Sequence, residues 1–516
     1  MNPVAEALRH PEAYPHPVEE GGNIQVVETH ISWIFLTGLY AYKLKKPVNL
    51  GFLDFSTLEK RRNCCLEELR LNRRLCPDLY LDVLPVVAAH GGWRIGGDGP
   101  AVDFVVRMLQ FDRSFELDRL LVANALPIER IGEIAKIVSC FHSSATVAPA
   151  YSTFGTPEVL LVPMLENLDR TGDLVHTPEE SNAMEAIRNW TLHEHRRLES
   201  VLKRRKECGF VRECHGDMHT GNMVIWNGKV MIFDCIEFNP KLSVIDVMSD
   251  AAFLFMDLQH SGRIRLAWHF LNTYLSNGGD YNGLRVLRLY CTYRAMVRAK
   301  VTAIRLMQET GREMQNAILD EHRSYLSLSL GYVRPSPPLL VLMHGLSGSG
   351  KSVLASMLAD SGFVHLRSDI ERKRLFGISP LDSSRPSGMD IYAPEATAQT
   401  YRMLLDAAES ALSGNWPVIV DATFLRKSQR EPFLELAARM GCMCRIISVQ
   451  APFETLRKRV TERLEKGADP SEADPAVLEA QLKSVEPPEG DEKALCIEVD
   501  TQGPVDYEKL AASLGS

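Results

Sequence analysis

The sequence predicts two domains, an α+β domain with two lobes followed by an α/β domain built on a parallel sheet. The chain has 516 residues, which is too long for one ordinary hydrophobic core. A proline-rich segment at 333–338 cannot continue a helix and separates two different sequence patterns. Before it, strand-like sequence gives way to helical sequence; after it, strands and helices alternate. We therefore assign residues 1–332 to the first domain, 333–338 to a linker and 339–516 to the second domain.

In the first domain, β-branched and aromatic residues between 23 and 45 predict strands. Leucines among many charged residues predict a helix over 56–75. Two further apolar pieces near 83–87 and 102–108 complete a small lobe that contains a sheet. From about residue 128 the sequence is mostly helical, which predicts a second, larger lobe.

In the second domain, apolar runs predict strands at 339–343, 417–420 and 445–449, with helical sequence between them. Alternation of this kind indicates βαβ units, whose strands are parallel. The carboxyl ends of such strands face a common crevice in which ligands bind. The residues that follow each strand are therefore the expected ligand-binding and catalytic residues.

Composition is that of a soluble globular enzyme, with 45% hydrophobic and 24% charged residues. A net charge of -8 argues against a dedicated nucleic-acid-binding protein, so we expect no nucleic-acid partner. The first thirty residues contain acidic groups and no apolar segment, and no run approaches the roughly 20 apolar residues of a membrane helix. The 11 cysteines are scattered without a CxxC pair, which favours reduced thiols. We expect a cytoplasmic protein with neither signal peptide nor membrane span.

The segment Gly345-Leu-Ser-Gly-Ser-Gly-Lys351-Ser352 fits the phosphate-binding loop (P-loop) pattern G-x-x-x-x-G-K-[ST]. It lies between a buried-looking strand and a predicted helix at 353–359, which is the context that the motif requires. Its backbone amides would surround a β-phosphate, and the helix N-terminus adds partial positive charge. Lys351 would reach the β- and γ-phosphates of ATP, and Ser352 would ligate Mg²⁺. The predicted nucleotide contacts are Gly345, Ser347, Gly348, Ser349, Gly350, Lys351 and Ser352.

Two further strands of this domain end in carboxylates. The strand-like piece at 364–369 ends in Asp369, which could accept the proton of an acceptor hydroxyl, while Arg372 steadies phosphate charge. The alternative for Asp369 is a helix N-cap, since it precedes a charged helix. Asp421 ends another strand and is a candidate for the metal shell or a substrate contact.

A later helix presents three arginines, Arg457, Arg459 and Arg463, before a stretch rich in Gly, Asp and Ser. The pattern suits a basic lid that closes over phosphates, or else an ordinary solvated helix. With GLSGSGKS, RSDIERKR and VIVDAT, it makes residues 339–510 resemble the small P-loop kinases of the gluconate, shikimate, chloramphenicol-phosphotransferase, zeta-toxin and polynucleotide-kinase group. The resemblance implies phosphoryl transfer to a hydroxyl and leaves the acceptor open.

A second motif lies in the first domain, at His215-Gly-Asp217-Met-His-Thr-Gly-Asn222. The acid and the amide have the spacing of a kinase catalytic loop, H-x-D-x-x-x-x-N. Asp217 can accept the proton of the acceptor hydroxyl, and Asn222 can give an oxygen to Mg²⁺. Asn-Gly at 227–228 predicts a hairpin whose second strand returns Asp234 beside Asn222 as a further metal ligand.

Other polar residues around this motif are predicted to be structural. His215 is expected to brace the loop, because Asp217 has the better position for a base. Asp246 and Asp250 are expected to tether this segment to the helices that follow.

Residues 20–330 resemble the aminoglycoside phosphotransferase-like enzymes, whose HGDxHxxN motif and following Asp are matched here. The resemblance implies a protein-kinase-like bilobal fold, with a strand lysine that contacts the α/β-phosphates and pairs with a helix glutamate. Tyr40-Ala-Tyr-Lys43-Leu-Lys45 offers two lysines, and residues 67–68 offer two glutamates. We assign Lys43 and Glu67, although both lysines could equally lie on a solvated strand edge. No glycine-rich loop precedes the lysine strand; only Gly38 is present.

Taken whole, the chain resembles bacterial fusion proteins described as bifunctional aminoglycoside phosphotransferase/ATP-binding proteins. We expect ATP- and Mg²⁺-dependent phosphoryl transfer to small-molecule hydroxyls at two sites. In the alternative, one domain is a non-catalytic nucleotide sensor or substrate-binding scaffold, and the missing glycine-rich loop points to the first domain. A toxin- or antitoxin-related kinase is a third possibility that rests on the zeta-toxin resemblance alone. The sequence leaves the acceptors and the oligomeric state open.

Overall fold

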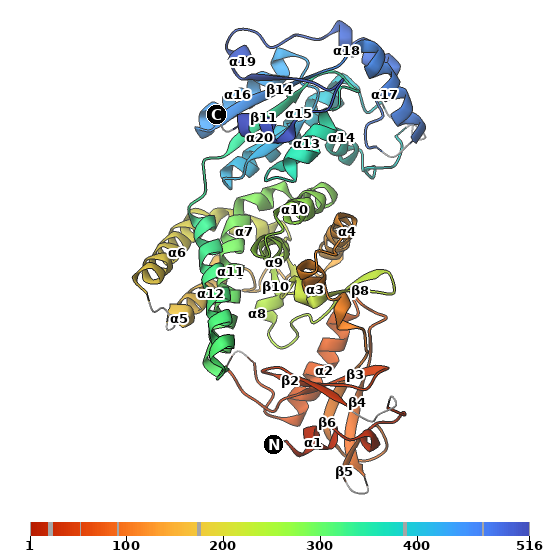
Figure 1. Ribbon diagram of the computed structural model, residues 1–516, viewed down its shortest axis with the longest axis vertical. Coiled ribbons are helices and arrows are strands. Elements are labelled where there is room, and N and C mark those ends of the chain that lie inside the picture. Colours follow the sequence, from red (N-terminus) through yellow and green to blue (C-terminus); the bar gives the residue numbers. More distant parts are fainter. Residues whose placement is uncertain are drawn as a thin grey trace. The chain divides into compact units, whose positions relative to one another are not determined.

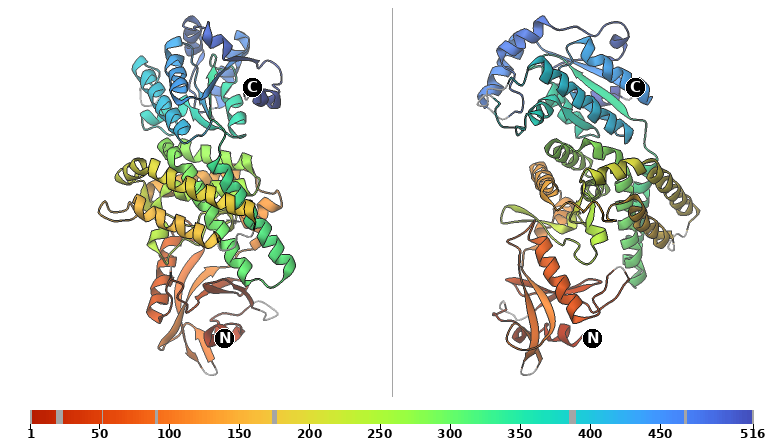
Figure 2. Two further views of the ribbon diagram at one scale, coloured as in Figure 1. Left: turned by 90° about the vertical axis from the view of Figure 1, so that its left-hand side faces the viewer. Right: turned by 180° about the vertical axis from the view of Figure 1, so that it is seen from behind.

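The computed structural model describes residues 2–18, 24–51, 53–89, 92–172, 177–384, 390–466 and 469–514. It contains two compact units, shown in Figures 1 and 2. The first unit joins Met1–Val162 to Leu202–Asp257, and the second joins Pro163–Val201 to Leu258–Ser516. The predicted linker follows a helix, α12 (Arg312–Val333), and precedes a strand, β11 (Leu339–His344). The helices at 258–333 nevertheless belong to the same unit as the P-loop, so the compact units divide the chain differently from the predicted domains.

The first unit contains a six-stranded antiparallel sheet in the order β1-β2-β3-β6-β4-β5. Its strands are β1 (Gln25–Glu28), β2 (Ser32–Leu36), β3 (Tyr40–Lys45), β4 (Tyr80–Ala89), β5 (Gly92–Ile95) and β6 (Ala101–Leu109). Helix α2 (Leu58–Asn72) packs against β4 and β6. The predicted strands and helix are confirmed, except that Asn23 lies outside the described residues.

Strand β3 divides its side chains between two surroundings. Tyr42 and Leu44 belong to a buried cluster that includes Leu8 and Tyr14 from the N-terminal segment, with α1 (Pro3–Ala7) and η1 (Pro11–Ala13). Because successive side chains of a strand point to opposite faces, Lys43 and Lys45 point the other way, toward α2. This alternation places both lysines at the candidate site.

The rest of the first unit is helical apart from short strands. The helices and turns are η2 (Arg113–Phe115), α3 (Leu117–Val122), α4 (Ile128–Ser144), α7 (Glu199–Glu207), η3 (Thr220–Asn222), α8 (Pro240–Ser243) and α9 (Val247–His260). Strands β7 (Val211–Glu213) and β10 (Val244–Asp246) pair with each other. The predicted hairpin is confirmed as β8 (Met223–Trp226) and β9 (Lys229–Ile232), with positive φ at Asn227 and Gly228, as a type I′ turn requires.

The second unit contains a five-stranded parallel sheet in the order β12-β13-β11-β14-β15, which confirms the predicted α/β class. The strands besides β11 are β12 (Val364–Arg367), β13 (Val418–Asp421), β14 (Met443–Gln450) and β15 (Cys496–Asp500). Every residue of β11 is buried, as expected of a central strand covered on both faces. Strand β15 was not predicted. The helices around this sheet are α13 (Lys351–Ala359), α14 (Ser368–Leu375), α15 (Pro394–Ser413), α16 (Lys427–Met440), α17 (Phe453–Lys466), α18 (Pro475–Lys483), α19 (Asp491–Ala494) and α20 (Tyr507–Leu514).

A helical layer of the second unit precedes this sheet in the sequence. It consists of α6 (Pro178–Arg197), α10 (Ile264–Gly278), η4 (Tyr281–Gly283), α11 (Leu284–Gln308) and α12, and α5 (Pro157–Gly172) spans the boundary between the units. Helix α11 packs along α12, and α10 packs against β12 and α13. The P-loop sheet is therefore in contact with helices that were predicted to belong to another domain.

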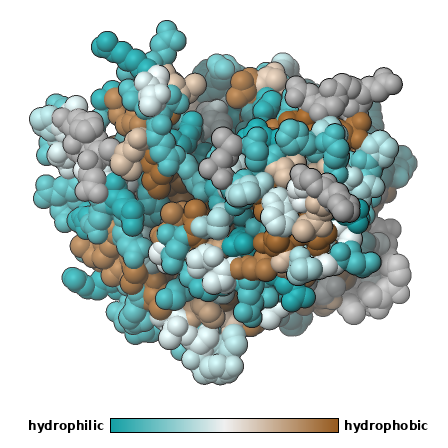
Figure 3. Space-filling model, turned by 90° about the horizontal axis from the view of Figure 1, so that it is seen from below, coloured by the Kyte–Doolittle hydropathy of each residue, from teal (hydrophilic) through white to brown (hydrophobic). Residues whose placement is uncertain are grey.

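The surface drawn in Figure 3 mixes hydrophobic groups of residues with hydrophilic ones. Among the described residues, no helix is both long and apolar enough to span a bilayer. All 11 cysteines are free, and seven of them are buried.

Candidate active sites

The P-loop connects β11 to α13 through glycines in conformations that other residues rarely adopt. Gly345 has φ 139° and Gly348 has φ 82°. A Cβ atom at Gly345 would lie 2.4 Å from the Val449 carbonyl oxygen, and one at Gly348 would lie 2.7 Å from the Leu456 carbonyl oxygen. The close packing of this loop therefore depends on glycine at both positions.

Lys351 begins α13 and is buried, with 7% of its surface exposed. Its Nζ donates a hydrogen bond to the Leu346 carbonyl oxygen at 2.8 Å. Burial lowers the pKa of Lys351 to about 8, although Asp421 and Asp369 act in the opposite direction. The ammonium group therefore lacks the close carboxylate partner that would hold its pKa at the usual value, and an anion would restore it.

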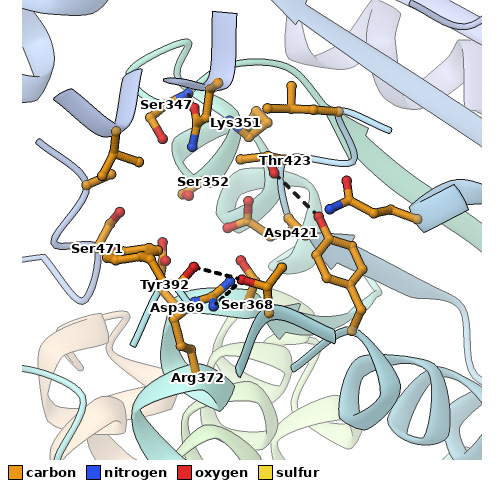
Figure 4. A pocket seen from close by; sticks show the side chains of 18 of the residues that line it. Ser347, Lys351, Ser352, Ser368, Asp369, Arg372, Tyr392, Asp421, Thr423 and Ser471 are labelled. Atoms are coloured by element: carbon orange, nitrogen blue, oxygen red, sulfur yellow. Dashed lines mark hydrogen bonds between the residues drawn. The ribbon is translucent and has the colours of Figure 1, made fainter. Parts of the chain in front are cut away.

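One cavity of about 920 Å³ collects the predicted residues of this unit. In Figure 4, Lys351 and Ser352 come from the P-loop and α13, Asp421 and Thr423 from the end of β13, and Asp369 and Arg372 from α14. Of the predicted glycines, Gly348 and Gly350 line the cavity, together with Ser347. Gly345 and Ser349 are not among the lining residues. Gly345 instead lies under the loop, against Val449.

Asp369 lies in the first turn of α14 and is half-buried. The N-cap of this helix is Arg367, and no side chain makes a capping hydrogen bond there. The capping alternative for Asp369 is therefore wrong. Arg372, one turn later, is buried; it donates to the Ile391 carbonyl oxygen at 2.9 Å and lies over the Tyr392 ring at 5.0 Å. Both side chains line the cavity on the side away from the P-loop.

Asp421 is buried at the carboxyl end of β13, beside β11. His365 Nε2 lies 3.4 Å and Arg367 Nε 3.8 Å from its carboxylate. Burial raises the pKa of Asp421, but the nearby cationic and imidazole groups outweigh this effect and lower it. A carboxylate held ionised at this position, together with the Ser352 hydroxyl, offers the hard oxygen donors that Mg²⁺ prefers.

The arginine-rich helix is α17, and two of its three arginines reach the cavity. Arg459 donates to the Thr501 carbonyl oxygen at 2.8 Å, and Arg463 donates to the Ala473 carbonyl oxygen at 3.1 Å. Arg457 is exposed and is not among the lining residues. The predicted lid therefore has two cavity-facing arginines rather than three.

Two residues that contact the P-loop were missed by sequence reasoning. Gln481 of α18 accepts a hydrogen bond from the Ser347 backbone N–H at 2.9 Å. Thr501 follows β15 and donates to the Ser349 carbonyl oxygen at 2.7 Å. Thr501 comes directly after the strand end at Asp500, so recognition of β15 would have pointed to it. Gln481 had no such signal.

In the first unit, Lys43 pairs with Glu68 rather than with the predicted Glu67. Lys43 Nζ lies 2.8 Å from Glu68 Oε1, and both residues are buried. Glu67 faces outward, where it binds Arg70. Adjacent helix positions point about 100° apart, so only one of the two glutamates can face the sheet. The solvated-edge alternative is also wrong, because β3 lies inside the sheet and both of its lysines are buried.

The lysines belong to a network with three carboxylates, in which the Glu68 and Glu237 side chains are buried and the Asp234 side chain is half-exposed. Lys43 also lies 2.6 Å from Asp234 Oδ1, and Lys45 contacts Glu68 and Glu237. Burial alone would lower the pKa of Lys43, but Asp234 and Glu68 outweigh it and hold this pKa well above its usual value. Burial raises the pKa of Glu237, the acid most remote from solvent after Glu68. Every charge here has an opposite partner.

The catalytic-loop motif is held by hydrogen bonds from both sides. The Asp250 carboxylate accepts the N–H groups of His215 and Gly216 at 2.9 and 3.0 Å. His215 Nε2 lies 2.9 Å from the Phe233 carbonyl oxygen, and its Nδ1 accepts the Asp217 N–H at 3.2 Å. Burial lowers the pKa of His215, which keeps the ring neutral. The bracing role of His215 and the tethering role of Asp250 are confirmed.

Asp246 accepts the Met248 N–H at 2.9 Å in the first turn of α9, which confirms its tethering role, and it also binds α7 through Arg205 at 2.6 Å. Asn222 Nδ2 donates to Asp217 Oδ2 at 3.0 Å, which joins the predicted base to the predicted metal ligand. Asp234 has a positive φ of 65°, an uncommon conformation for a residue with a side chain. The hairpin carries it back to the lysine network, where Lys43 binds it.

The turns beside the lysine strand are short. Residues 29–31 join β1 to β2 and residues 37–39 join β2 to β3, and Gly38 is the only glycine in them. In protein kinases a flexible glycine-rich loop covers the phosphates next to this strand. Here the Thr29 N–H donates a hydrogen bond to the Ser32 carbonyl oxygen at 2.9 Å, which closes the first turn.

Comparison with known proteins gives three kinds of similarity. Residues 340–488 match a family described as AAA domain. An uncharacterized protein of Mycobacterium tuberculosis (strain ATCC 25618 / H37Rv) is 29% identical over 476 residues, which cover 90% of this chain and 91% of that protein.

Solved structures that are similar to this chain cover different shares of it. A choline/ethanolamine kinase family protein from Mesorhizobium loti covers 64% of this chain and 98% of its own, with 11% identity and a TM-score of 0.39. Kti12 from Chaetomium thermophilum, in complex with ADP-AlF3, covers 34% of this chain and 95% of its own, with 18% identity and a TM-score of 0.27. The predicted resemblance to a two-part fusion is confirmed: the C-terminal part matches the AAA domain model, and nearly the whole chain aligns with a mycobacterial protein.

Proposed function

We propose that the protein is an ATP- and Mg²⁺-dependent phosphotransferase that moves the γ-phosphate to a hydroxyl of a small molecule. The observation that supports this most is that Lys351, Ser352, Asp421 and Asp369 line one cavity of about 920 Å³. Phosphate-binding amides, hard oxygen donors and a carboxylate for an acceptor proton are thereby brought together. A volume of this size suits a nucleotide with a small acceptor.

In the proposed reaction, the acceptor oxygen attacks the γ-phosphorus while Asp369 takes its proton. The bond from the γ-phosphorus to the β,γ-bridging oxygen breaks, and ADP leaves. Lys351, Arg372 and Arg463 neutralise charge on the transferred group. Ser352 and Asp421 would hold Mg²⁺, which when bound neutralises charge on the β- and γ-phosphates.

The first unit would form the second nucleotide site. Lys43 would contact the α/β-phosphates, Asp217 would accept the acceptor proton, and Asn222 and Asp234 would hold Mg²⁺. The donor set fits, because the Asn222 amide nitrogen is engaged by Asp217 and its oxygen remains to face a cation.

A second candidate assigns the first unit a non-catalytic role as a nucleotide sensor or substrate-binding scaffold. The observation that favours it is the pair of short turns at 29–31 and 37–39, which hold a single glycine. A turn that is closed by a backbone hydrogen bond has less freedom to cover phosphates than a glycine-rich loop.

A metabolite library with labelled ATP would test both candidates on the full chain. Catalysis at the P-loop site alone is supported if Asp369→Asn lowers the rate of transfer by about 10²-fold and Asp217→Asn leaves that rate intact. Separate products lost in each variant support two active sites. Full activity in both variants would refute the assigned roles.

A further inference from the structure

We propose that α10 and the turn after it, residues 264–283, are a working part of the P-loop site, with Tyr281 and Asn272 as positioning residues. They precede the linker, yet they hold the β12–α14 segment that presents Asp369 and Arg372. The inference rests on the proposed phosphotransferase function of this site, and it adds residues that touch neither nucleotide nor acceptor.

Asn272 of α10 binds the edge of the parallel sheet. Strand β12 is an edge strand, so one side of its backbone lacks a neighbouring strand. The Asn272 amide donates to the Phe363 carbonyl oxygen at 2.9 Å and accepts the His365 N–H at 2.8 Å. One side chain thus replaces two hydrogen bonds of a missing strand. Because α14 begins directly after β12, this contact fixes the start of the helix that carries Asp369.

Tyr281 holds the next part of the segment. Its hydroxyl donates to Glu371 Oε1 at 2.9 Å, and both residues are buried. Residues three apart share one helix face, so Asp369 and Arg372 lie toward the cavity. Glu371 lies about 200° around the helix from Asp369, on the face that Tyr281 contacts. Tyr281 therefore fixes the rotation of α14 about its own axis.

Arg374, on the same face as Glu371, completes the attachment. It donates to Glu371 Oε2 at 2.9 Å and to the Asn277 carbonyl oxygen at 3.1 Å, and it also contacts the Ser276 carbonyl oxygen. These carbonyl groups lie in the last turn of α10, where the helix dipole favours a cation. Gly279 adopts φ 75° beside it, and a Cβ atom there would lie 2.9 Å from Arg374 Nη1.

Catalysis at the P-loop would therefore depend on these helices. A proton acceptor must be placed to within a fraction of an ångström of the hydroxyl, and a displacement of 1 Å can cost about 10²-fold in rate. Loss of one of these contacts to the β12–α14 segment should lower the rate of phosphoryl transfer. It should leave nucleotide affinity intact, because β11 and α13 hold the P-loop without α14.

The test uses the full chain with Asp217→Asn, so that ATP turnover comes from the P-loop site, and measures ATP hydrolysis with water as the acceptor. Adding Tyr281→Phe should lower kcat about tenfold or more while KM for ATP and the Kd for MgADP stay within about twofold. Tyr325→Phe is the matched control: it removes a buried tyrosine hydroxyl of α12 that accepts from Arg298 of α11, and its ring stacks on His260 of α9. It should leave kcat unchanged.

Rescue distinguishes positioning from packing. Glu371→Gln keeps an oxygen that can accept from Tyr281, so it should retain more activity than Glu371→Ala. Unchanged kcat in Tyr281→Phe and in Glu371→Ala would overturn the inference. Equal losses in kcat and in MgADP affinity would also overturn it, because they would indicate general loosening of the unit.

Amide hydrogen exchange separates this inference from the proposed function. Tyr281→Phe should speed exchange in α14 and leave α13 unchanged. If the Asp217→Asn background shows no ATP turnover, the proposed function of the P-loop site fails. Exchange in α14 then still decides the attachment: unchanged protection would refute it.

Discussion

The two candidate sites pair their lysines in opposite ways. In the first unit, Lys43 and Lys45 face three carboxylates, and the pKa of each lysine is held well above its usual value. In the second unit, Lys351 donates to a carbonyl oxygen, and burial lowers its pKa to about 8. In the first unit each lysine already has carboxylate partners, whereas Lys351 would gain an anionic partner only when a ligand binds. The contrast teaches that a buried lysine of a candidate site can be held by carboxylates in one unit and be left to bind an anion in the other.

Removing the lysine should have its largest effect in the first unit. Lys43→Met would leave Glu68 buried with one cation fewer, and breaking a buried pair this way costs about 3–5 kcal/mol. Thermal unfolding of the full chain should show the loss. Lys60→Met, at an exposed pair with Asp54, should cost far less, because solvent screens that pair. Equal stability of the two variants would contradict the contrast.

The same change at the P-loop should act on binding. Lys351→Met should weaken MgADP binding about tenfold to hundredfold, the usual worth of a hydrogen bond to a charged group. It should leave the melting temperature unchanged or higher, because it removes a buried charge without a carboxylate hydrogen bond. Lys458→Met, an exposed lysine of α17, is the calorimetric control. A lower melting temperature in Lys351→Met would place Lys351 with the structural lysines.

Binding at the P-loop should depend on pH above about 8. The free site has a Lys351 pKa of about 8, and bound phosphate raises it. Binding therefore takes up a proton above pH 8, and affinity falls by up to about tenfold per pH unit until the pKa of the bound state is reached. Calorimetry in two buffers with different ionisation enthalpies measures this uptake. Uptake that persists in Lys351→Met would assign it to another group.

The smallest effect is expected at Glu67. It is half-buried and pairs with Arg70 at the surface, so Glu67→Gln should change stability by under about 1 kcal/mol and leave nucleotide binding intact. Glu68→Gln, one residue away, should destabilise the first unit and lower its nucleotide affinity. Urea unfolding and MgADP titration of the pair test which glutamate serves Lys43.

The sequence was most informative where a site lies within one short segment. Gly345–Ser352 and the loop from His215 to Asn222 could be recognised because their turns use local chemistry, and Asn227-Gly228 placed the hairpin for the same reason. The choice between Glu67 and Glu68 failed because it depends on how α2 is rotated against the sheet. That rotation is set by packing with β4 and β6, which no local pattern encodes.

Distant contributors were also out of reach. Gln481 comes to the P-loop from more than a hundred residues away, and its neighbours give no sign of it. The attachment of α10 to α14 was hidden because the proline-rich segment between them correctly indicated a break in secondary structure. A break in the helix pattern does not show whether the helices before it pack against the domain that follows it.

That attachment has a practical consequence for dividing the molecule. Arg288 of α11 lies over the Trp416 ring at 4.0 Å and donates to the Asn415 carbonyl oxygen at 2.7 Å, and the Trp416 indole N–H donates back to the Leu284 carbonyl oxygen at 3.1 Å. Limited proteolysis within 334–338 would sever the chain without releasing its C-terminal piece, and the fragments should co-elute on gel filtration. Recombinant expression of the P-loop half should therefore include the helices α10, α11 and α12 rather than start after the prolines.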